Sequence, residues 1–282
     1  MNIGIVLNYK NYSQSIDCTN NLLNSDMDKV VIVDNASGNE SYQKLKEYFR
    51  NNKKVHIISS DVNSGYAQGN NIGLIYVQNR FGISSKNIVY IINPDSRIDS
   101  SNVDDIRKHI INNENSGMVT VNLNNDIKNS WHHLSVKNIF FINFWSIRWL
   151  LFKFGKREGG YYKKGNTAIQ KVDVVSGAFF GINQKVFKEI GYFDKGTFLY
   201  YEEEILYSKL IQNGFQNYIL NTSSFDHIGR GSTSFKKVPF KKINDKSRLY
   251  VLKKYYGVGP LYVSFSKFIN VIDDFLLTVL KR

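Results

Sequence analysis

Two groups of acidic residues, far apart in the sequence, are the side chains of this chain best suited to chemistry. Asp95 follows the hydrophobic run Ile91-Ile92 after a short Asn-Pro turn, and Glu202, Glu203 and Glu204 lie together further along. A lone carboxylate suits a divalent ion that also binds phosphate, because Mg²⁺ commonly takes one or two carboxylates and completes its shell with phosphate oxygens. Clustered carboxylates suit a general base, since neighbouring like charges raise a carboxyl pKa. The pattern predicts a divided site, with a cation-and-phosphate half and a base half.

The elements that must position these groups begin with alternating apolar runs and helical patterns. We expect strands at 3–7, 30–34, 55–59 and 87–92, and helices around 13–24, 40–51 and 67–78. Such alternation predicts a parallel sheet with crossover helices, and ligands of such sheets bind beyond the carboxyl ends of the strands. Two strands end there in turn-forming sequence that carries an acid, at 34–38 and at 93–95. Both loops are therefore candidates for the site.

Regular structure is predicted less evenly in the second half. A helix begins at Asp99 or Ser100, and a strand follows at 118–121. The segment 137–157 is aromatic and basic without any acid, and its periodicity is weak. The remaining predictions are regular structure at 172–182, a helix at 184–190, and a helix at 203–213 that ends at Gly214.

Composition limits the partners and the compartment. The chain has 282 residues, 42% hydrophobic and 22% charged, with a net charge of +13, which favours a polyanionic partner such as nucleic acid, anionic lipid or a phosphorylated substrate. Its single cysteine, Cys18, excludes an internal disulfide and fits a reducing compartment. The segment 1–7 leads directly into a strand, so we expect no signal peptide and a cytoplasmic protein.

Seven short motifs together resemble the family 2 inverting glycosyltransferases, in particular the rhamnosyltransferase-like branch of bacterial polysaccharide biosynthesis. They are Val33-Asp34-Asn35-Ala36-Ser37, Asn63-Ser64-Gly65-Tyr66-Ala67-Gln68-Gly69-Asn70-Asn71-Ile72-Gly73, Asn93-Pro94-Asp95, Ser176-Gly177-Ala178-Phe179-Phe180, Gly191-Tyr192-Phe193-Asp194, Phe198-Leu199-Tyr200-Tyr201-Glu202-Glu203 and His227-Ile228-Gly229-Arg230-Gly231-Ser232. The resemblance covers roughly residues 3–235 and implies an α/β chain with the GT-A fold, a mixed central sheet flanked by helices. It implies a GT-A domain at 1–235, divided into a nucleotide-binding half at 1–122 and an acceptor half at 123–235. A basic, amphipathic helical extension would occupy 236–282.

The resemblance implies a catalytic base in the acidic cluster. The family carries Glu-Asp here with the Asp as base, which corresponds to Glu203. Because glutamate replaces aspartate, the choice between Glu203 and Glu202 stays open. Negative charge at the start of a helix is also favoured by the helix dipole, which is the structural alternative for these residues.

Binding of a nucleotide-sugar donor is implied for two loops. The residues that correspond to donor-binding positions of the family are Asp34, Asn35, Asn63, Gly65, Asn70 and Asn93. A purely structural alternative exists for each loop: an Asp-Asn-x-Ser turn at Asp34, and a tight turn before a helix at 63–73.

A divalent metal, Mg²⁺ or Mn²⁺, is implied at Asp95, with His227 touching the metal or the diphosphate. The alternatives are that Asp95 caps the next helix and that His227 is structural. Asn93 stands where relatives with two acids have the first of them, so we expect little metal affinity in the absence of donor.

The C-terminal region predicts an amphipathic helix from Leu261, beside a lysine-rich segment that begins at Lys236. Its apolar residues recur at three- and four-residue steps, and Asp273 and Asp274 interrupt them too much for a membrane span. One alternative is packing on the core or on a second subunit, which would make a homodimer. The other is a peripheral position on the anionic inner face of the plasma membrane.

The functional prediction is transfer of a sugar from dTDP-rhamnose or a UDP-hexose to a glycan acceptor, lipid-linked, in cell-surface polysaccharide synthesis. One alternative is a catalytically inactive GT-A assembly partner, suggested by the departures at Asn93 and Glu203. The other is a basic nucleic-acid-binding protein, suggested by the charge and the aromatic content. We predict no nucleic-acid partner, because the aromatic residues fall on core-like positions and no nucleic-acid-binding motif is present.

Overall fold

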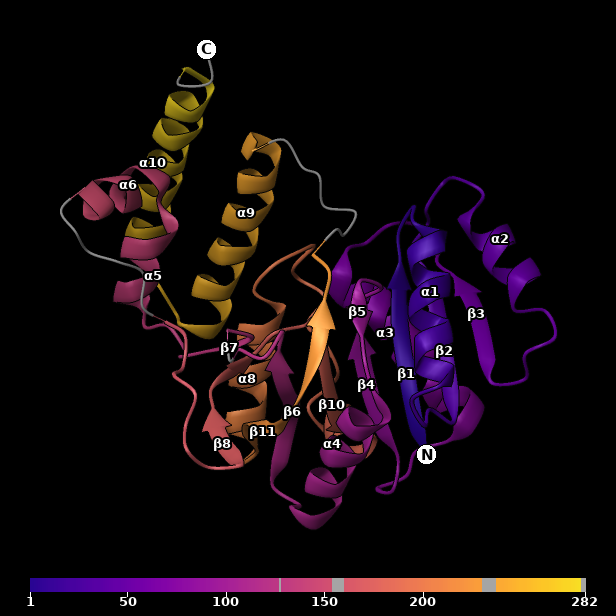
Figure 1. Cartoon of the computed structure of the whole chain (residues 1–282). Helices are drawn as coiled ribbons and strands as arrows, with labels where there is room; N and C mark the ends of the chain where they lie inside the picture. Colours follow the sequence, from indigo (N-terminus) through magenta and orange to yellow (C-terminus); the bar gives the residue numbers. More distant parts are fainter. Residues whose placement is uncertain (127, 154–159, 230–236, 280–282) are drawn as a thin grey trace.

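The computed structural model describes residues 1–126, 128–153, 160–229 and 237–279, and its centre is a mixed sheet (Figure 1). The strand order is β3-β2-β1-β4-β10-β6-β11-β5, with β8 paired to β11, and β7 pairs β9 separately. The strands are β1 (Asn2–Asn8), β2 (Lys29–Asp34), β3 (Val55–Ser59), β4 (Ile88–Ile92), β5 (Ser96–Arg97), β6 (Ser116–Leu123), β7 (Ser130–Trp131), β8 (Ile169–Val172), β9 (Val174–Val175), β10 (Phe179–Asn183) and β11 (Gln216–His227). The helices are α1 (Tyr12–Leu23), α2 (Ser41–Tyr48), α3 (Tyr66–Phe81), α4 (Ser100–Asn112), α5 (Val136–Asn143), α6 (Trp145–Lys153), α7 (Gln184–Glu189), α8 (Glu202–Gln212), α9 (Lys237–Tyr255) and α10 (Pro260–Val279).

The first half of the chain forms the parallel part of the sheet. Strands β1, β2, β3 and β4 pair in parallel, with β1 between β2 and β4. The Val and Ile residues of β1, β2 and β4 are buried on both faces, as expected of strands covered by crossover helices, whereas those of the edge strand β3 are only partly buried after Val55. The four predicted strands and three predicted helices of this half are confirmed.

The second half adds strands that turn the sheet into a mixed one. Strand β10 runs antiparallel to β4, with Phe179 opposite Ile92, and β11 runs parallel to β6. The segment predicted as regular at 172–182 is interrupted, since β9 ends at Val175 and β10 begins at Phe179. Strand β11 was not predicted, because its polar residues and its register shift between Leu220 and Ser224 break the alternation of a regular strand.

Two helical layers cover the two faces of the sheet. Helices α1, α2 and α4 bury their apolar residues in one core cluster, and α3, α7 and α8 do so in another on the opposite face. The predicted helix ends are also confirmed: Asp99 caps α4 in a capping box, and Gly214 follows α8 with φ of +83°. Asp95 therefore does not cap α4.

Helices α5, α6, α9 and α10 form a helical group on the side of the molecule that holds β6, β8 and β11, away from β1, β2 and β3 (Figure 1). Asp194, after α7, anchors α9: its carboxylate accepts hydrogen bonds from the hydroxyls of Tyr250 and Tyr255 and from Lys254, each at 2.6 Å. Ser247 of α9 donates to the carbonyl of Leu199. The group is thereby fixed against the loop that precedes α8.

Helix α10 confirms the predicted amphipathic helix but not the alternative in which its apolar side packs on the core of its own chain. The buried residues of α10 are Ser266, Ile269 and Asp273, whereas Phe268 and Phe275 are exposed. Among the described helices, none is both long and apolar enough to cross a bilayer.

Candidate active site

The loops at the carboxyl ends of β1, β2 and β4 enclose a cavity of about 590 Å³ together with the break before β10 and the start of α8. This is the edge of the sheet where ligands of α/β proteins bind. The lining residues are Leu7, Asn8, Tyr9, Asn11, Gln14, Asn35, Asn63, Gly65, Tyr66, Asn93, Pro94, Asp95, Ser176, Gly177, Ala178, Phe198, Leu199, Tyr200, Glu202, Glu203, His227, Gly229 and Ile243. Both predicted halves of the divided site thus lie in one cavity.

One wall of the cavity is a network of amides. The side-chain NH₂ of Asn35 donates to Oδ1 of Asn63 at 3.0 Å and to the carbonyl of Gly65 at 3.2 Å. The same Oδ1 accepts from the backbone N–H of Gly65 at 3.0 Å. Gly65 has φ of +94°, and a Cβ there would lie 2.0 Å from the carbonyl oxygen of Phe198, so only glycine fits. The loop conformation is therefore tied to the segment before α8.

Asn93 also lines this cavity, whereas Asp34 and Asn70 do not belong to its lining. The buried Asp34 carboxylate accepts from Asn8 Nδ2 at 2.6 Å and from the hydroxyl and backbone N–H of Ser37. These bonds match the turn-forming alternative for Asp34. Asn70, on α3, donates to the carbonyl of Tyr66, and its buried Oδ1 has no hydrogen-bond partner.

Asp95 and His227 are brought together by the pairing of β5 with β11. His227 lies opposite Ser96, and the backbone N–H of Ile228 donates to the carbonyl of Asp95. As a result, His227 Nε2 lies 3.0 Å from Asp95 Oδ1. Both side chains line the cavity, and Asp95 is buried apart from its cavity-facing surface.

This pair fits the predicted divalent ion by supplying two of its six ligands. A carboxylate oxygen and an imidazole nitrogen are both ligands that Mn²⁺ accepts, and Mg²⁺ needs only one or two carboxylates besides phosphates. No group of three or more His, Cys, Asp or Glu side chains within the described ranges could hold a metal by itself. The remaining ligands would have to come from the donor, in line with the expected low affinity in its absence. Arg230 to Ser232, the rest of this motif, lie outside the described residues.

The three glutamates at the start of α8 have different surroundings. The Gly177 backbone N–H donates to Glu203 Oε1 at 3.0 Å, and the hydroxyl of Tyr66 donates to the Gly177 carbonyl at 2.7 Å. Glu202 also lines the cavity but is only 4% exposed, and its Oε1 has no hydrogen-bond partner. Glu204 points away from the lining and accepts from the indole N–H of Trp131 at 3.0 Å.

Burial raises the pKa of all three carboxyl groups. For Glu202, loss of solvation comes first and the charge of Glu203 second, and together they raise the pKa to about 8. For Glu204 the same two causes raise the pKa to about 7, and burial raises the pKa of Glu203. The hydrogen bond from Gly177 opposes the rise at Glu203, because it stabilises the charged form. Glu203 is therefore the carboxylate of this cluster that accepts a hydrogen bond from another loop of the cavity wall.

Several residues of the cavity were not predicted from sequence. Tyr66 lies in a motif noted above, but nothing marked its hydroxyl as the group that holds Gly177. Tyr200, which lines the cavity, and its neighbour Tyr201, which does not, both have left-handed backbone conformations, with φ of 75° and 69°. Such strain persists only where surrounding structure enforces it, and it sets the direction in which α8 begins. Tyr9, Asn11 and Gln14, which follow β1, also line the cavity. They could have been predicted, because ligands of such sheets bind beyond the carboxyl ends of the strands.

Comparisons with known proteins agree with this geometry. The model of the glycosyl transferase family 2 matches residues 5–191. The hexosyltransferase Agl10 of low-salt glycan biosynthesis in Haloferax volcanii is 28% identical over 200 residues, which are 71% of this chain and 58% of that protein. The chain thus spans little more than half of this curated relative.

Solved structures show the same fold at low sequence identity. GalNAc-T7, solved with UDP, GalNAc and Mn²⁺, superposes with a TM-score of 0.60 at 12% identity over 97% of this chain and 55% of that chain. TarS of S. aureus, residues 1–349, superposes with a TM-score of 0.53 at 14% identity over 97% of this chain and 71% of that chain. The mixed sheet, the cavity at its strand ends and the match over most of the chain lead to one conclusion. This protein has the GT-A fold and belongs to the glycosyl transferase family 2.

Proposed function

We propose that this protein is an inverting glycosyltransferase that moves a sugar from a nucleotide-diphosphate donor to a glycan acceptor. The observation that carries the proposal is that Glu203, fixed by the Gly177 amide, lines the same cavity as Asp95 and His227. A base and a phosphate-binding pair in one cavity are what a single displacement at a sugar carbon requires. The family match supports the reaction class.

The amide wall supports donor binding. Asn35 and Asn63 offer neutral hydrogen-bonding groups, and Gly65 lets the backbone approach a ligand closely, a combination suited to a nucleoside. Asp34 would act from behind this wall by holding the loop that carries Asn35, and Asn70 by holding the first turn of α3. Asp95 and His227, with Asn93 beside them, would hold the diphosphate and a Mg²⁺ or Mn²⁺ ion, which offsets negative charge on the leaving group.

Glu203 would supply the base. Its carboxylate accepts the proton of an acceptor hydroxyl while that oxygen forms the bond to the anomeric carbon. The bond from that carbon to the diphosphate oxygen breaks in the same step, and the nucleoside diphosphate leaves on the opposite face, which inverts the configuration. Glu202, whose pKa is raised to about 8 by burial and by the charge of Glu203, keeps its proton at neutral pH.

Donors for a first test follow from the relatives. Agl10 is named a hexosyltransferase, and GalNAc-T7 and TarS were each solved with UDP, so UDP-hexoses come first. dTDP-rhamnose comes next, from the resemblance to the rhamnosyltransferase-like branch. The acceptor we propose is a growing glycan of the cell surface, carried on a lipid.

A paired binding and transfer experiment tests the proposal. Thermal shift with UDP- and dTDP-sugars, with and without Mn²⁺, should raise the melting temperature for one nucleotide, because a ligand of the folded state stabilises it by mass action. Glu203→Gln should keep that shift but lower the transfer rate by about 10²–10⁴-fold, the usual contribution of a general base. Glu202→Gln is the matched control and should transfer at a rate much closer to that of the unaltered protein.

Two results would reject parts of the proposal. Transfer by Glu203→Gln at the unaltered rate would move the base to another residue. A well-folded protein whose melting temperature responds to no nucleotide would favour the inactive assembly partner.

A further inference from the structure

Helix α10 is packed with its polar side inward. Its buried residues include Ser266 and Asp273, and Asp273 has no exposed surface. A helix on the surface of a water-soluble protein normally does the reverse, with its apolar stripe on the core and its charges in solvent. The orientation of α10 therefore calls for an explanation.

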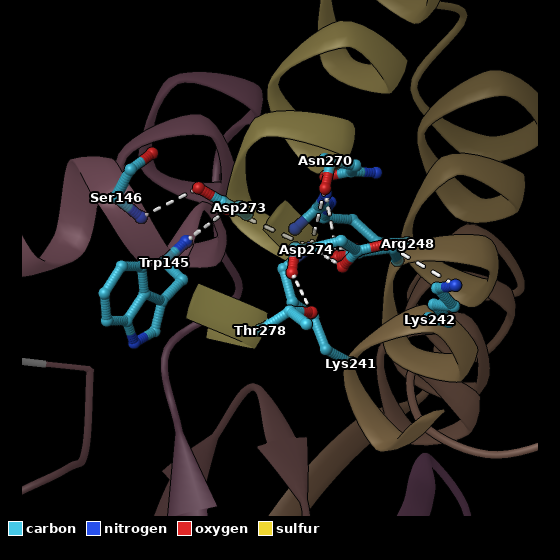
Figure 2. A network of polar contacts seen from close by, with 10 residues as sticks. Trp145, Ser146, Lys241, Lys242, Arg248, Asn270, Asp273, Asp274 and Thr278 are labelled. Atoms are coloured by element: carbon cyan, nitrogen blue, oxygen red, sulfur yellow. Dashed lines mark hydrogen bonds and ion pairs between the residues drawn. The ribbon is translucent and has the colours of Figure 1, made fainter. Parts of the chain in front are cut away.

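A network of charges fixes this orientation (Figure 2). Asp273 accepts from the backbone N–H groups of Trp145 and Ser146 at 2.7 and 3.0 Å, which makes it the N-terminal cap of α6. Lys241 of α9 contacts Asp274 at 3.2 Å. Because several polar partners would be lost together, α10 cannot rotate about its axis without leaving buried charges unpaired.

Arg248 of α9 completes the network and is almost fully buried. Its Nη2 donates to Asn270 Oδ1 at 2.7 Å and lies 3.1 Å from Asp245 Oδ1, while its guanidinium lies 4.5 Å from the centre of the Phe144 ring. Polar contacts thus join α10 to α9 and to the first turn of α6. The polar side of α10 is used internally, which leaves its apolar side outward.

The outward face of α10 is a long apolar stripe. Phe268 is 63% and Phe275 is 67% exposed, values that a core residue never has. The exposed apolar residues of the helix are Leu261, Phe265, Phe268, Val271, Ile272, Phe275 and Val279. At 100° per residue these positions fall on one side of the helix, along about 30 Å of its length. Trp149 and Leu150 of the neighbouring α6 are exposed as well.

The charges around this stripe are positive. Of the side chains that the structure describes on α5, α6 and α10, the exposed charged ones are Lys137, Arg148 and Lys267. The two acids of α10 are turned inward by the network described above. Helix α9, packed against α10, also exposes Lys242, Lys246 and Lys253.

From this arrangement we infer that the outward face of α10, with the exposed part of α6, docks on an anionic lipid surface. Exposed Phe, Trp and Leu beside Lys and Arg are the composition of helices that lie in the membrane interface. A second copy of the chain is the less suitable occupant, because it would bring the same positive charges, out of a net +13, against this face. The inference goes beyond the proposed function and does not depend on it.

The position of the helical group gives docking a consequence for the site. Ile243 of α9 lines the catalytic cavity, and α9 is fixed to α10 through Lys241 and Asp274. Docking of α10 would therefore also hold α9, which carries one residue of the cavity lining, at a fixed place relative to the lipid surface.

Vesicle co-sedimentation of the whole chain tests the inference. We expect binding to vesicles of phosphatidylcholine mixed with phosphatidylglycerol, weaker binding to phosphatidylcholine alone, and release at high salt. The variant Phe268→Gln/Phe275→Gln should bind the anionic vesicles at least about tenfold more weakly, since two apolar side chains no longer enter the interface. Its melting temperature should not fall, because both residues face solvent in the free protein.

A matched control removes two apolar side chains elsewhere. Ile111 and Ile211, on α4 and α8, are 44% and 45% exposed, and Ile111→Gln/Ile211→Gln should bind vesicles as well as the unaltered protein. Equal vesicle binding by the two double variants would overturn the inference. Failure of the unaltered protein to bind anionic vesicles would also overturn it. So would a dimer of the unaltered protein, measured by light scattering, that is lost in Phe268→Gln/Phe275→Gln but kept in Ile111→Gln/Ile211→Gln.

Discussion

The backbone N–H of Gly177 and Oε1 of Glu203 are 3.0 Å apart and form a hydrogen bond across the cavity wall. Gly177 lies in the break between β9 and β10, and Glu203 lies in the first turn of α8. The segment between these two strands therefore holds the carboxylate that we propose as the base. The carbonyl of Gly177 accepts a hydrogen bond from the hydroxyl of Tyr66, the first residue of α3. The position of Glu203 therefore depends both on the segment before β10 and on α3.

Gly177→Ala should lower turnover while the protein stays folded. A Cβ at this position would lie 2.9 Å from Glu203 Oε1 and 2.9 Å from the Tyr66 hydroxyl, and both side-chain ends would have to move. Because a base acts only within hydrogen-bonding reach, we expect kcat to fall by about 10–100-fold with donor binding retained. Steady-state kinetics and donor titration check this. Gly259→Ala, where nothing lies within 4 Å of the added Cβ, should leave kcat unchanged.

Gly65→Ala should lower the free energy of unfolding more than an alanine at another glycine with positive φ. Gly65 and Gly38 both have positive φ, but a Cβ at Gly65 would lie 2.0 Å from the Phe198 carbonyl oxygen, whereas nothing lies within 4 Å at Gly38. Both alanine variants are destabilised because alanine is strained in a left-handed backbone conformation. Gly65→Ala is destabilised further by the overlap of its Cβ with the Phe198 carbonyl oxygen. We expect Gly65→Ala to lose at least about 2 kcal/mol more free energy of unfolding than Gly38→Ala. Urea denaturation compares the two, and equal losses would mean that the loop moves freely away from Phe198.

Raising the pH should destabilise the protein through Glu202. The unfolded chain ionises this carboxyl near pH 4.5, whereas the folded protein keeps its proton until about pH 8. The favourable contribution is therefore complete below pH 4.5 and is lost as the pH rises through 8. The side chain introduced by Glu202→Gln cannot ionise. Between pH 5 and 8 the free energy of unfolding should therefore fall by on the order of 3 kcal/mol less in this variant than in the unaltered protein. Urea titrations at both pH values measure this, and parallel losses in the two proteins would exclude Glu202 as the cause.

Asp194→Asn should loosen the helical group. Hydrogen bonds from Lys254, Tyr250, Tyr255 and the Gly196 amide hold the pKa of Asp194 well below its ordinary value, against the effect of burial. A lowered pKa means that the stabilisation is present at neutral pH and is lost as the pH falls. We expect a loss of about 2 kcal/mol at neutral pH, typical of hydrogen bonds to a charged group. Urea denaturation measures this loss, and the control is the variant Asp61→Asn, because Asp61 is an exposed aspartate.

The first four strands, their helices and the loops that carry the site could be predicted from the sequence. Runs such as Val30–Val33 and turns such as Asn93-Pro94-Asp95 act through local preferences, and the strand-end rule then places the loops at one edge. The family motifs added the mixed sheet. Strand β11 could not be predicted, because its pairing with β6 and β8 outweighs a sequence that does not alternate.

The site was predicted in its residue types but not in its geometry. The sequence marked Asp34 and Asn35 equally, and only the fold showed that Asp34 faces Asn8 and Ser37 while Asn35 lines the cavity. The family resemblance pointed to Glu203 as the base but left the choice between Glu203 and Glu202 open. The difference between them comes from the Gly177 amide, which lies far away in the chain and approaches only when β10 joins the sheet.

Helix α10 shows the same division most clearly. Its sequence alone determined an amphipathic helix, because period and composition are local properties. It did not determine which face would point inward, since an isolated helix has no inside. The tertiary structure decided this. Asp273 accepts hydrogen bonds from the backbone of α6, and Asp274 pairs with Lys241. These contacts stabilise the inward position of the two acids by more than the exposure of Phe268 and Phe275 costs.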